Sequence, residues 1–439
     1  MKRLFTALVF FFGLIGSSQA MKAEDVKLFT LENGMKIIVV EDYTIPNANM
    51  YLFWKVGSRN EVPGITGLSH FFEHMMFNGA KKYGPKMFDR VMEAAGGANN
   101  AYTTENLTAY TDWFPASSLE TMFELEADRI ANLDINAEVL ESERDVVMSE
   151  RRTGLENSNW RVLNEEVKAA AFRAHPYSWS VIGHESDIMN WKLDDLIEYH
   201  KTYYTPNNAI VVISGAVEFE QVKKLADKYF APIQAQPKPR DVLTIEPEQK
   251  GERRVYVQKS SVSTPNMMVA YHVPHAMHQD FYALSLLETI LGWGNSSRLE
   301  RSLVDKGLVI SADTHMSMSI DPNLFYFYLV ASEGIGIEEI EQAFVAQIND
   351  LIANGVSERE LTKAKNMKLM DFYREQETIN GKSSNIGTYE LFFGNYEALF
   401  NVPEALEKIT VDDIKRVAHI YFRKSNRTVG VLAAKEDRD

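Results

Sequence analysis

Three polar residues, His70, Glu73 and His74, stand close together near the start of the chain. They lie in Gly67–Phe77, whose apolar pattern predicts a helix that ends at Asn78-Gly79. His70 and His74 are four positions apart, so on a helix they project from one face and can share one metal ion. Glu73 leans toward the same face, where it can take a proton from a water held by such an ion.

The order His-x-x-Glu-His is a known signature of metallopeptidases. By chance it arises in roughly one or two of every hundred chains of this length. Alternatively, the two histidines are hydrogen-bonded residues of the core and bind no metal. A catalytic zinc site needs a third protein ligand and an open position for water, so a further ligand decides between these interpretations.

The best candidates for a third ligand are Glu143 and Glu150. They are seven positions apart in a predicted helix, Asn136–Glu156, and therefore share one face across two turns. Val146 and Val147 lie between them and are expected to pack inward. A carboxylate among buried valines is unfavourable unless it is paired with a cation or a metal. The alternative is a solvated acidic helix face.

A repeat divides the chain into halves. Residues 193–218 resemble residues 411–436 at a constant offset of 218 positions. A helix-then-strand unit that recurs at half length indicates duplication of a whole domain. The expected units are a signal peptide in residues 1–20, a catalytic zinc-binding domain in 21–231, a proline-containing linker in 232–250 and a homologous non-catalytic domain in 251–439.

Each domain is expected to have the same α+β fold, in which a mainly antiparallel sheet is covered on one face by helices. The first domain begins with strand signals. Val26–Leu31 and Met35–Val40 are predicted to form a hairpin around Asn33-Gly34, a dipeptide that favours a type I′ turn.

The offset also predicts what the second domain lacks. It places Glu288 at the position of His70 and Gly292 at the position of His74. The second domain is therefore expected to keep the helix without a metal site, so that one zinc ion is bound per chain.

The first twenty residues have the composition of a secretory signal peptide. A basic start, the apolar run Leu4–Ile15 and the small residues before Ala20 predict cleavage after Ala20. No later stretch is apolar enough to span a membrane. The chain contains no cysteine, so no disulfide stabilises it. We expect the protein in a bacterial periplasm, with full secretion as the alternative.

The chain is acidic, with a formal net charge of −15 at pH 7. Such a surface repels phosphate groups and argues against nucleic acid and anionic membranes as partners. It says little about the substrate, because surplus acidic residues also favour solubility.

Several stretches together carry a family resemblance. The motif from His70 to His74 is followed 76 residues later by Glu150. With this spacing the chain resembles the pitrilysin/insulinase-like zinc peptidases, the M16 family, over nearly its whole length after residue 20. Further similar stretches are Leu31–Gly34, Gly57-Ser58, Gly97–Thr103 and His175–Tyr177.

The resemblance implies a role for each residue of the site. His70, His74 and Glu150 would bind zinc, and His, His and Glu suit this metal well. Glu73 would be the catalytic general base that deprotonates the attacking water. Glu143 would orient one of the ligands, as carboxylates outside a metal's coordination shell commonly do.

The resemblance also implies a substrate-binding strand. Asn99, Asn100 and Ala101 would belong to an edge strand on which an extended peptide is laid by β-augmentation. For Asn99 and Asn100 the alternative is ordinary turn chemistry.

One departure from the family pattern bears on partners. Family members that bind substrate with their second half carry an Arg and a Tyr, seven positions apart, after Ser-Arg-Leu. Here Ser297–Leu299 is present, but the Arg position falls near Val304, allowing a one-residue gap, and the Tyr position falls at Ile310. The chain thus resembles the zinc-bearing subunit of a two-subunit periplasmic enzyme, whose homologous partner supplies the Arg/Tyr pair. A homodimer is the alternative.

Two functions are compatible with these features. The first is a zinc endopeptidase that hydrolyses extended or unfolded peptides in a closed chamber. The second is a non-catalytic assembly or interaction subunit of the same fold. Glu73 favours the enzyme, because a purely structural zinc site needs no base.

Overall fold

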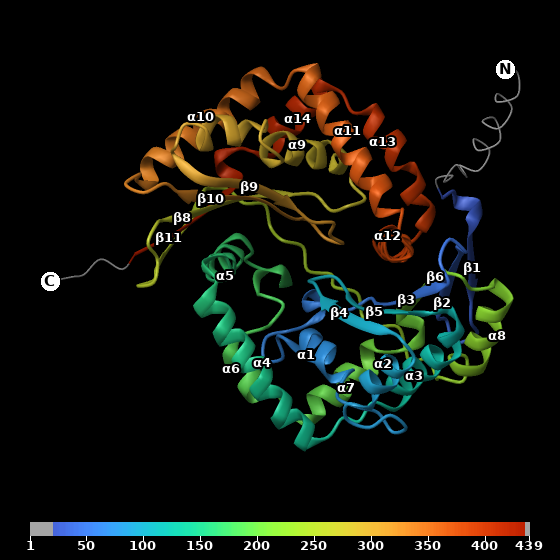
Figure 1. Cartoon of the computed structure of the whole chain (residues 1–439). Helices are drawn as coiled ribbons and strands as arrows, with labels where there is room; N and C mark the ends of the chain where they lie inside the picture. Colours follow the sequence, from blue (N-terminus) through green and yellow to red (C-terminus); the bar gives the residue numbers. More distant parts are fainter. Residues whose placement is uncertain (1–20, 435–439) are drawn as a thin grey trace, which may run out of the picture.

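The computed structural model describes residues 21–434, which fold around two β-sheets (Figure 1). The predicted signal peptide lies outside the described residues. The first sheet has the order β1 (Val26–Thr30), β2 (Lys36–Glu41), β6 (Ala209–Gly215), β3 (Asn47–Trp54), β5 (Thr108–Pro115) and β4 (Ala98–Thr103). The second has the order β7 (Arg253–Gln258), β11 (Arg427–Ala433), β8 (Asn266–Val273), β10 (Asn323–Ala331) and β9 (Val309–Met316).

Within these sheets, the pairs β2–β6 and β7–β11 are parallel and the other pairs are antiparallel. This confirms the predicted α+β class with two mainly antiparallel sheets.

The helices of the first half are α1 (Leu68–Met75), α2 (Met87–Ala94), α3 (Leu119–Asn132), α4 (Ala137–Asn157), α5 (Asn159–Ala171), α6 (Glu185–Asn190), α7 (Leu193–Tyr203) and α8 (Phe219–Tyr229). Those of the second are α9 (Phe281–Gly292), α10 (Ile337–Asn354), α11 (Glu358–Glu375), α12 (Ile379–Phe393), α13 (Val402–Lys408) and α14 (Val411–Tyr421).

The repeat is visible in matched elements of the two halves. Helices α7 and α14 begin 218 positions apart, as do strands β6 and β11. The side-chain amide of Asn208 donates 2.8 Å to the carbonyl of Tyr203, and that of Asn426 donates 2.8 Å to the carbonyl of Tyr421. The two halves therefore use the same side chain to join a helix to the strand that follows it.

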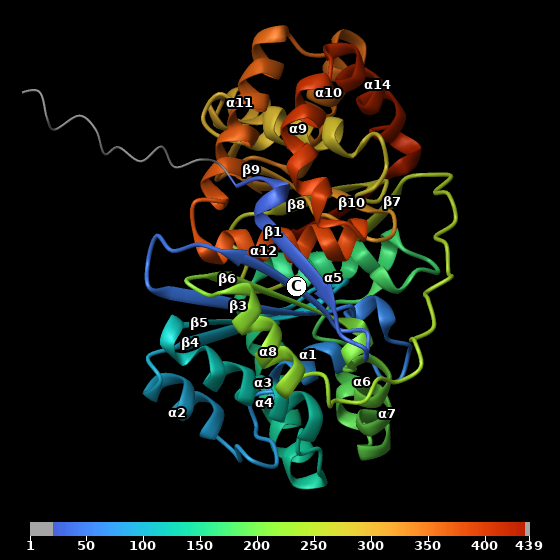
Figure 2. The same ribbon diagram turned by 90° about the vertical axis from the view of Figure 1, so that its right-hand side faces the viewer.

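The halves exchange one helix each, which the sequence did not predict. Helix α5 packs on β7, β8 and β11 of the second sheet, and α12 packs on β3 and β6 of the first (Figures 1 and 2). A Cβ at Gly430 would overlap Val167 of α5, and one at Gly387 of α12 would overlap Phe53, so a glycine permits each close approach. Each sheet is thus covered on both faces rather than on one.

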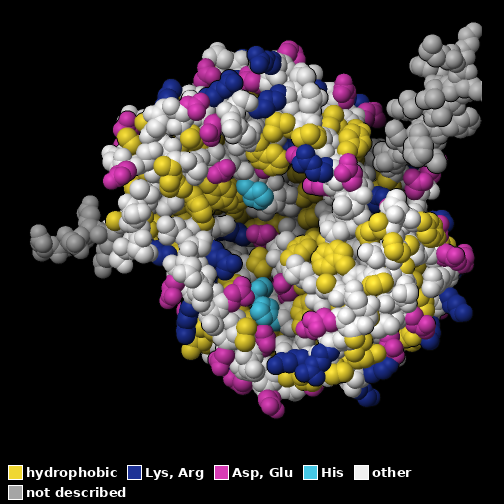
Figure 3. All heavy atoms as spheres, viewed as in Figure 1, with side chains coloured by type: hydrophobic (Ala, Val, Ile, Leu, Met, Phe, Trp, Pro, Cys, Tyr) yellow, Lys and Arg dark blue, Asp and Glu magenta, His cyan; other side chains and the backbone are white. Residues whose placement is uncertain are grey.

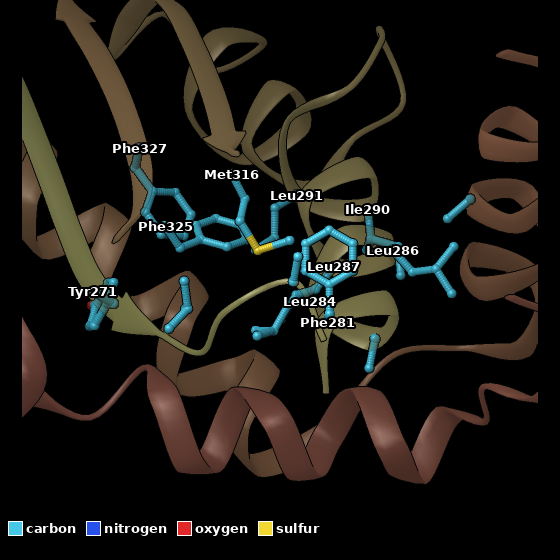
Figure 4. Close-up of a cluster of buried hydrophobic side chains, with 14 of the residues drawn as sticks. Tyr271, Phe281, Leu284, Leu286, Leu287, Ile290, Leu291, Met316, Phe325 and Phe327 are labelled. Atoms are coloured by element: carbon cyan, nitrogen blue, oxygen red, sulfur yellow. The ribbon is translucent and has the colours of Figure 1, made fainter. Parts of the chain in front are cut away.

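This exchange explains why β6 is buried along its whole length, Ala209–Gly215. One face of the first sheet packs against α1, α3, α7 and α8, and the other shares a core with α12. That shared core continues into the second half, where Phe281, Leu287, Phe325 and Phe327 lie close together (Figure 4). The ion pairs Lys36–Glu390 and Lys382–Asp42 also join α12 to the first half. The halves are therefore held together by packing as well as by the linker.

The first hairpin forms, but with a different turn. Strands β1 and β2 pair antiparallel from Thr30 and Lys36 outward, and the Gly34 amide donates to the Leu31 carbonyl. Gly34 has φ 86°, whereas Asn33 does not have a positive φ, so the predicted type I′ turn is wrong. A type I′ turn needs positive φ at both central residues, and here only the glycine takes it.

The chain between α8 and β7 contains no helix or strand. It coincides with the predicted linker, 232–250, although the predicted domain boundaries themselves stay a prediction. None of the helices within residues 21–434 combines the length and apolar character that crossing a bilayer requires.

Candidate active site

The helix that carries the motif, α1, begins at an unusual cap. Gly67 has φ 91°, and a Cβ there would lie 2.5 Å from the carbonyl oxygen of Ile182. The buried carboxylate of Glu61 accepts hydrogen bonds of 2.8 Å from the backbone amides of Gly67 and Ser69. Burial raises the pKa of Glu61 to about 8, although both hydrogen bonds oppose this shift. Glu61 thus fixes the start of α1, and with it the direction of the motif side chains.

Replacing Glu61 by alanine is expected to destabilise the fold. The change leaves two buried amides without an acceptor, which costs about 1–3 kcal/mol for each amide. Glu61→Gln keeps one acceptor oxygen and should cost less. Chemical denaturation of both variants measures the difference, and a wild-type free energy of unfolding for Glu61→Ala would contradict this role of Glu61.

The structure brings His70, His74 and Glu150 together. Helix α1 supplies the histidines and α4 supplies the glutamate. The Oε2 atom of Glu150 lies 3.6 Å from Nε2 of His70 and 3.5 Å from Nε2 of His74. Among residues 21–434 these three form the single cluster of His, Cys, Asp or Glu side chains that can hold a metal ion, with their ligand atoms within 4.8 Å of one another.

These distances fit a zinc site. Ligands about 2.0–2.1 Å from a tetrahedral zinc ion are roughly 3.3–3.4 Å apart, close to the separations of Glu150 from the two histidines. Neither ring nitrogen of His70 forms a hydrogen bond within the described residues, and its buried Nδ1 has no partner there. This argues against the alternative of two hydrogen-bonded core histidines. Burial lowers the pKa of His70 to about 4, which favours the neutral ring.

Glu143 contacts the opposite side of His74. Its Oε1 atom lies 2.7 Å from Nδ1 of His74, and its Oε2 atom accepts a 2.7 Å hydrogen bond from the side chain of Asn78. Burial lowers the pKa of His74. The nearby carboxylates of Glu143 and Glu150 have the larger combined effect and raise this pKa to about 9. Glu143 is therefore placed to orient the ring, with Nε2 directed toward Glu150.

Glu73 is half-buried on the same side of α1. Its Oε2 atom accepts a 2.6 Å hydrogen bond from Oγ1 of Thr103, a residue of the edge strand β4. Burial raises the pKa of Glu73, and the hydrogen bond from Thr103 opposes this. A raised pKa brings a carboxylate closer to the range in which it exchanges protons near neutral pH.

The predicted substrate-binding residues, Asn99, Asn100 and Ala101, lie in β4 at the free edge of the first sheet. The following turn is formed by Thr104–Leu107, so plain turn chemistry for the asparagines is wrong. Next to the edge is a hollow of about 330 Å³, which we call the edge pocket. It is lined by Glu73, His74, Phe77, Asn78, Asp89, Asn99, Asn100, Ala101 and Glu143.

One expectation about α4 is wrong. Val147 is buried as predicted, but 47% of Val146 is exposed. The two valines lie on either side of the Glu143–Glu150 stripe, and only the side of Val147 faces the core. Val146 instead lines an open groove beside the metal ligands.

The second half has an ion pair where the first half has metal ligands. Glu288 of α9 and Lys368 of α11 stand 218 positions after His70 and Glu150, and their side chains lie 3.0 Å apart. Leu291, which is fully buried, stands 218 positions after Glu73. At the corresponding place, the described part of this half therefore carries neither the ligands nor the base.

Apolar side chains occupy the positions at which other family members are expected to carry the Arg and the Tyr. Ile310, 64% exposed, lies on the edge strand β9, and Val304 lies in a short helical turn before it. Neither side chain can donate a hydrogen bond. Arg298 is bound instead by Glu360 at 2.7 Å and by the carbonyl of Gly355 at 2.9 Å, which gives it a structural role.

Sequence reasoning missed Glu61 and the hydroxyl of Thr103. Glu61 lies nine positions before His70, and no pattern links a carboxylate at that distance to a helix cap. Thr103 was noted only within the stretch Gly97–Thr103. Its contact with Glu73 depends on how β4 lies beside α1, which the sequence alone does not determine.

Comparisons with known proteins match both halves. The family model "Insulinase (Peptidase family M16)" matches residues 36–185, and the model "Peptidase M16 inactive domain" matches residues 190–368. A relative from Helicobacter pylori named "Zinc protease PqqE" is 31% identical over 410 residues, which cover 92% of this chain and 91% of the relative.

Solved structures have the same fold. The crystal structure of a protease from Helicobacter pylori superposes with a TM-score of 0.89 at 31% identity, covering 93% of this chain and 99% of that one. The periplasmic protease PqqL from Escherichia coli has a TM-score of 0.78 at 17% identity, covering 95% of this chain but only 48% of that one. The PqqL chain is thus about twice as long as the matched part.

Proposed function

Because the chain belongs to the insulinase-like M16 peptidase family, we propose that it is a zinc-dependent endopeptidase acting on extended or unfolded peptides. One observation carries this proposal: His70, His74 and Glu150 converge from two helices, and Glu73 is held beside them. The site lies in the half matched by the insulinase model, whereas the half matched by the "inactive domain" model carries the Glu288–Lys368 pair.

His70, His74 and Glu150 would hold one zinc ion, and Glu143 would fix the ring of His74. Zinc bound there would polarise the scissile carbonyl and lower the pKa of a water molecule. The chain's own contribution to the chemistry is the carboxylate of Glu73. It would accept the proton of the attacking water and deliver it to the leaving amine, while Thr103 holds one carboxylate oxygen in place.

The substrate would bind along β4. The free edge of this strand offers unpaired backbone groups, and an extended peptide can add to it as a further strand. Thr103 of the same strand contacts Glu73, so a peptide laid along β4 passes close to the base. Folded proteins are poor substrates in this arrangement, because their backbone groups are already paired.

A second subunit would complete the enzyme. The side chain of Glu150 is 39% exposed, and histidine and acidic side chains are visible in the hollow between the halves (Figure 3). A single chain thus leaves the site open to solvent, and a closed chamber requires a second subunit. The double length of the PqqL chain supports a homologous partner, which would supply the Arg and Tyr absent at Val304 and Ile310. A homodimer is the alternative.

The protein would act in the periplasm. The signal peptide predicted in residues 1–20 supports this location, and the similar Escherichia coli protein is described as a periplasmic protease. The relation to PqqL is one of fold, so the location rests mainly on the signal peptide.

The test is peptide cleavage by zinc-loaded protein of residues 21–439. It would be incubated with a quenched, unstructured peptide and with a folded protein, alone and with a homologous chain that carries the Arg/Tyr pair. We expect cleavage of the peptide only, fastest with the partner. If no peptide is cleaved under either condition, the non-catalytic assembly subunit becomes the better account.

A further inference from the structure

A groove of about 830 Å³ runs along α4 on the other side of the metal ligands from the edge pocket. The two hollows share no lining residue: Glu150 lines the groove, and His74 lines the edge pocket. The metal ligands therefore lie between the edge pocket beside β4 and this groove. The groove holds one cationic side chain, that of Arg161.

Arg161 lies in the first turn of α5, is exposed, and forms no ion pair with any carboxylate of residues 21–434. The three arginines of the neighbouring α4 differ, since Arg144, Arg151 and Arg152 are paired with Glu141, Glu165 and Glu185. Arg161 is nevertheless near the site, because it lines the same groove as the metal ligand Glu150. Its guanidinium is available for an anion that the chain itself does not supply.

A glycine in α4 makes room for this side chain. Gly154 has no positive φ, so its backbone does not require glycine, and glycine is unfavourable inside a helix. A Cβ at Gly154 would overlap the Nη1 atom of Arg161 and lie 3.2 Å from its Cζ. The absence of a side chain at this position lets the guanidinium lie close to α4, in the groove.

We propose that Arg161 binds a carboxylate of the peptide substrate, on the α4 side of the scissile bond. This inference rests on the proposed peptidase function and adds a substrate preference to it. A guanidinium binds a carboxylate through two parallel hydrogen bonds, which gives both strength and direction. Ser149, Thr153 and Asn157 line the same groove and offer neutral donors beside it.

The charge of the rest of the chain opposes the binding of a carboxylate, so the attraction must come from Arg161. With a net charge of −15, the protein as a whole repels acidic peptides. Asp145 and Glu150 also line the groove, so Arg161 is the one residue there that attracts an anion. The carboxylate can come from an internal Asp or Glu side chain or from the C-terminus of a short peptide, since both present the same group.

Binding is measured apart from cleavage, so that this inference and the peptidase proposal can fail separately. Zinc-loaded Glu73→Gln protein is titrated with labelled peptides in which one position at a time is Glu or Gln, and with one peptide that ends in a carboxylate or an amide. The same titrations are made with Arg161→Gln and Gly154→Ala added to Glu73→Gln. Arg152→Gln is the matched control, because Arg152 is paired with Glu185 on the surface of α4. Cleavage of the same peptides by wild type is recorded in parallel.

At one position of the peptide, we expect Glu to give binding that is roughly tenfold or more tighter than Gln. This ratio corresponds to the usual strength of a charge-assisted hydrogen bond. The ratio should fall to about one in Arg161→Gln, fall partly in Gly154→Ala, and stay unchanged in Arg152→Gln. If instead the C-terminal acid and amide differ, the terminus is the source of the carboxylate. An unchanged ratio in Arg161→Gln, no carboxylate preference at any position, or no binding at all overturns the inference. Binding discrimination without cleavage by wild type contradicts the peptidase proposal alone.

Discussion

Changing Glu73 to glutamine is expected to lower kcat/KM for peptide cleavage by roughly 10²–10⁴-fold, the usual contribution of a general acid–base residue. Glutamine has nearly the same shape and can still accept the hydrogen bond from Thr103, but it cannot take up a proton. The three ligands His70, His74 and Glu150 are unchanged, so zinc content should stay at the wild-type value. Initial rates on a quenched peptide and metal analysis of the same samples measure both quantities.

The matched control for this prediction is Glu141→Gln. Glu141 is a carboxylate of α4 whose side chain is 69% exposed and pairs with Arg144 rather than with a residue of the site. It should leave both rate and zinc content unchanged. Equal rates for wild type and Glu73→Gln would mean that Glu73 is not the base or that a contaminant cleaves the peptide.

The second large effect concerns a buried charge cluster under the first sheet. Arg129 of α3 is 2% exposed and donates 2.8 Å from Nε to the equally buried Glu126. Its guanidinium also lies 4.4 Å from the ring centre of Phe88 and 4.5 Å from that of Tyr110. Burial raises the pKa of the adjacent Asp112 well above its usual range, which favours the neutral form of Asp112.

Replacing Arg129 by methionine should destabilise the protein by roughly 3–5 kcal/mol, because the partner charge is left buried and unpaired. Adding Glu126→Gln should recover part of the loss. Chemical denaturation of the single and double variants measures it, with Arg152→Met as the control. Arg152 is 61% exposed, and surface pairs of this kind contribute about 0–1 kcal/mol. A loss of 1 kcal/mol or less for Arg129→Met would contradict this account of the cluster.

The predicted family and the two-sheet α+β fold are confirmed. They could be predicted because their signals are local or periodic. His70 and His74 share a face by helix geometry alone, and the 218-residue offset placed Glu288 and Gly292 in α9 without further information. Glu150 depended on the family resemblance, since the helical pattern alone left Glu143 and Glu150 equivalent.

What the sequence did not provide depends on tertiary packing. The exchange of α5 and α12 between the halves leaves no signal in the sequence, because the residues of a helix do not show which of two sheets it covers. The same holds for Val146, whose exposure is decided by where α4 meets the core. Arg161 was not singled out, because nothing in the sequence shows that Gly154 lies beneath it.

Zinc-dependent cleavage is the most direct test of the central claim that His70, His74 and Glu150 form the centre of a peptidase. The protein of residues 21–439, alone and with a homologous chain that carries the Arg/Tyr pair, would be stripped of metal with a chelator and titrated with zinc. Cleavage of an unstructured peptide would be followed throughout. We predict no cleavage without metal and recovery that is complete at one zinc ion per chain, with a recovered rate in Glu73→Gln that is roughly 10²–10⁴-fold lower. Cleavage that survives metal removal, or one bound zinc ion without any cleavage by wild type, would contradict the account.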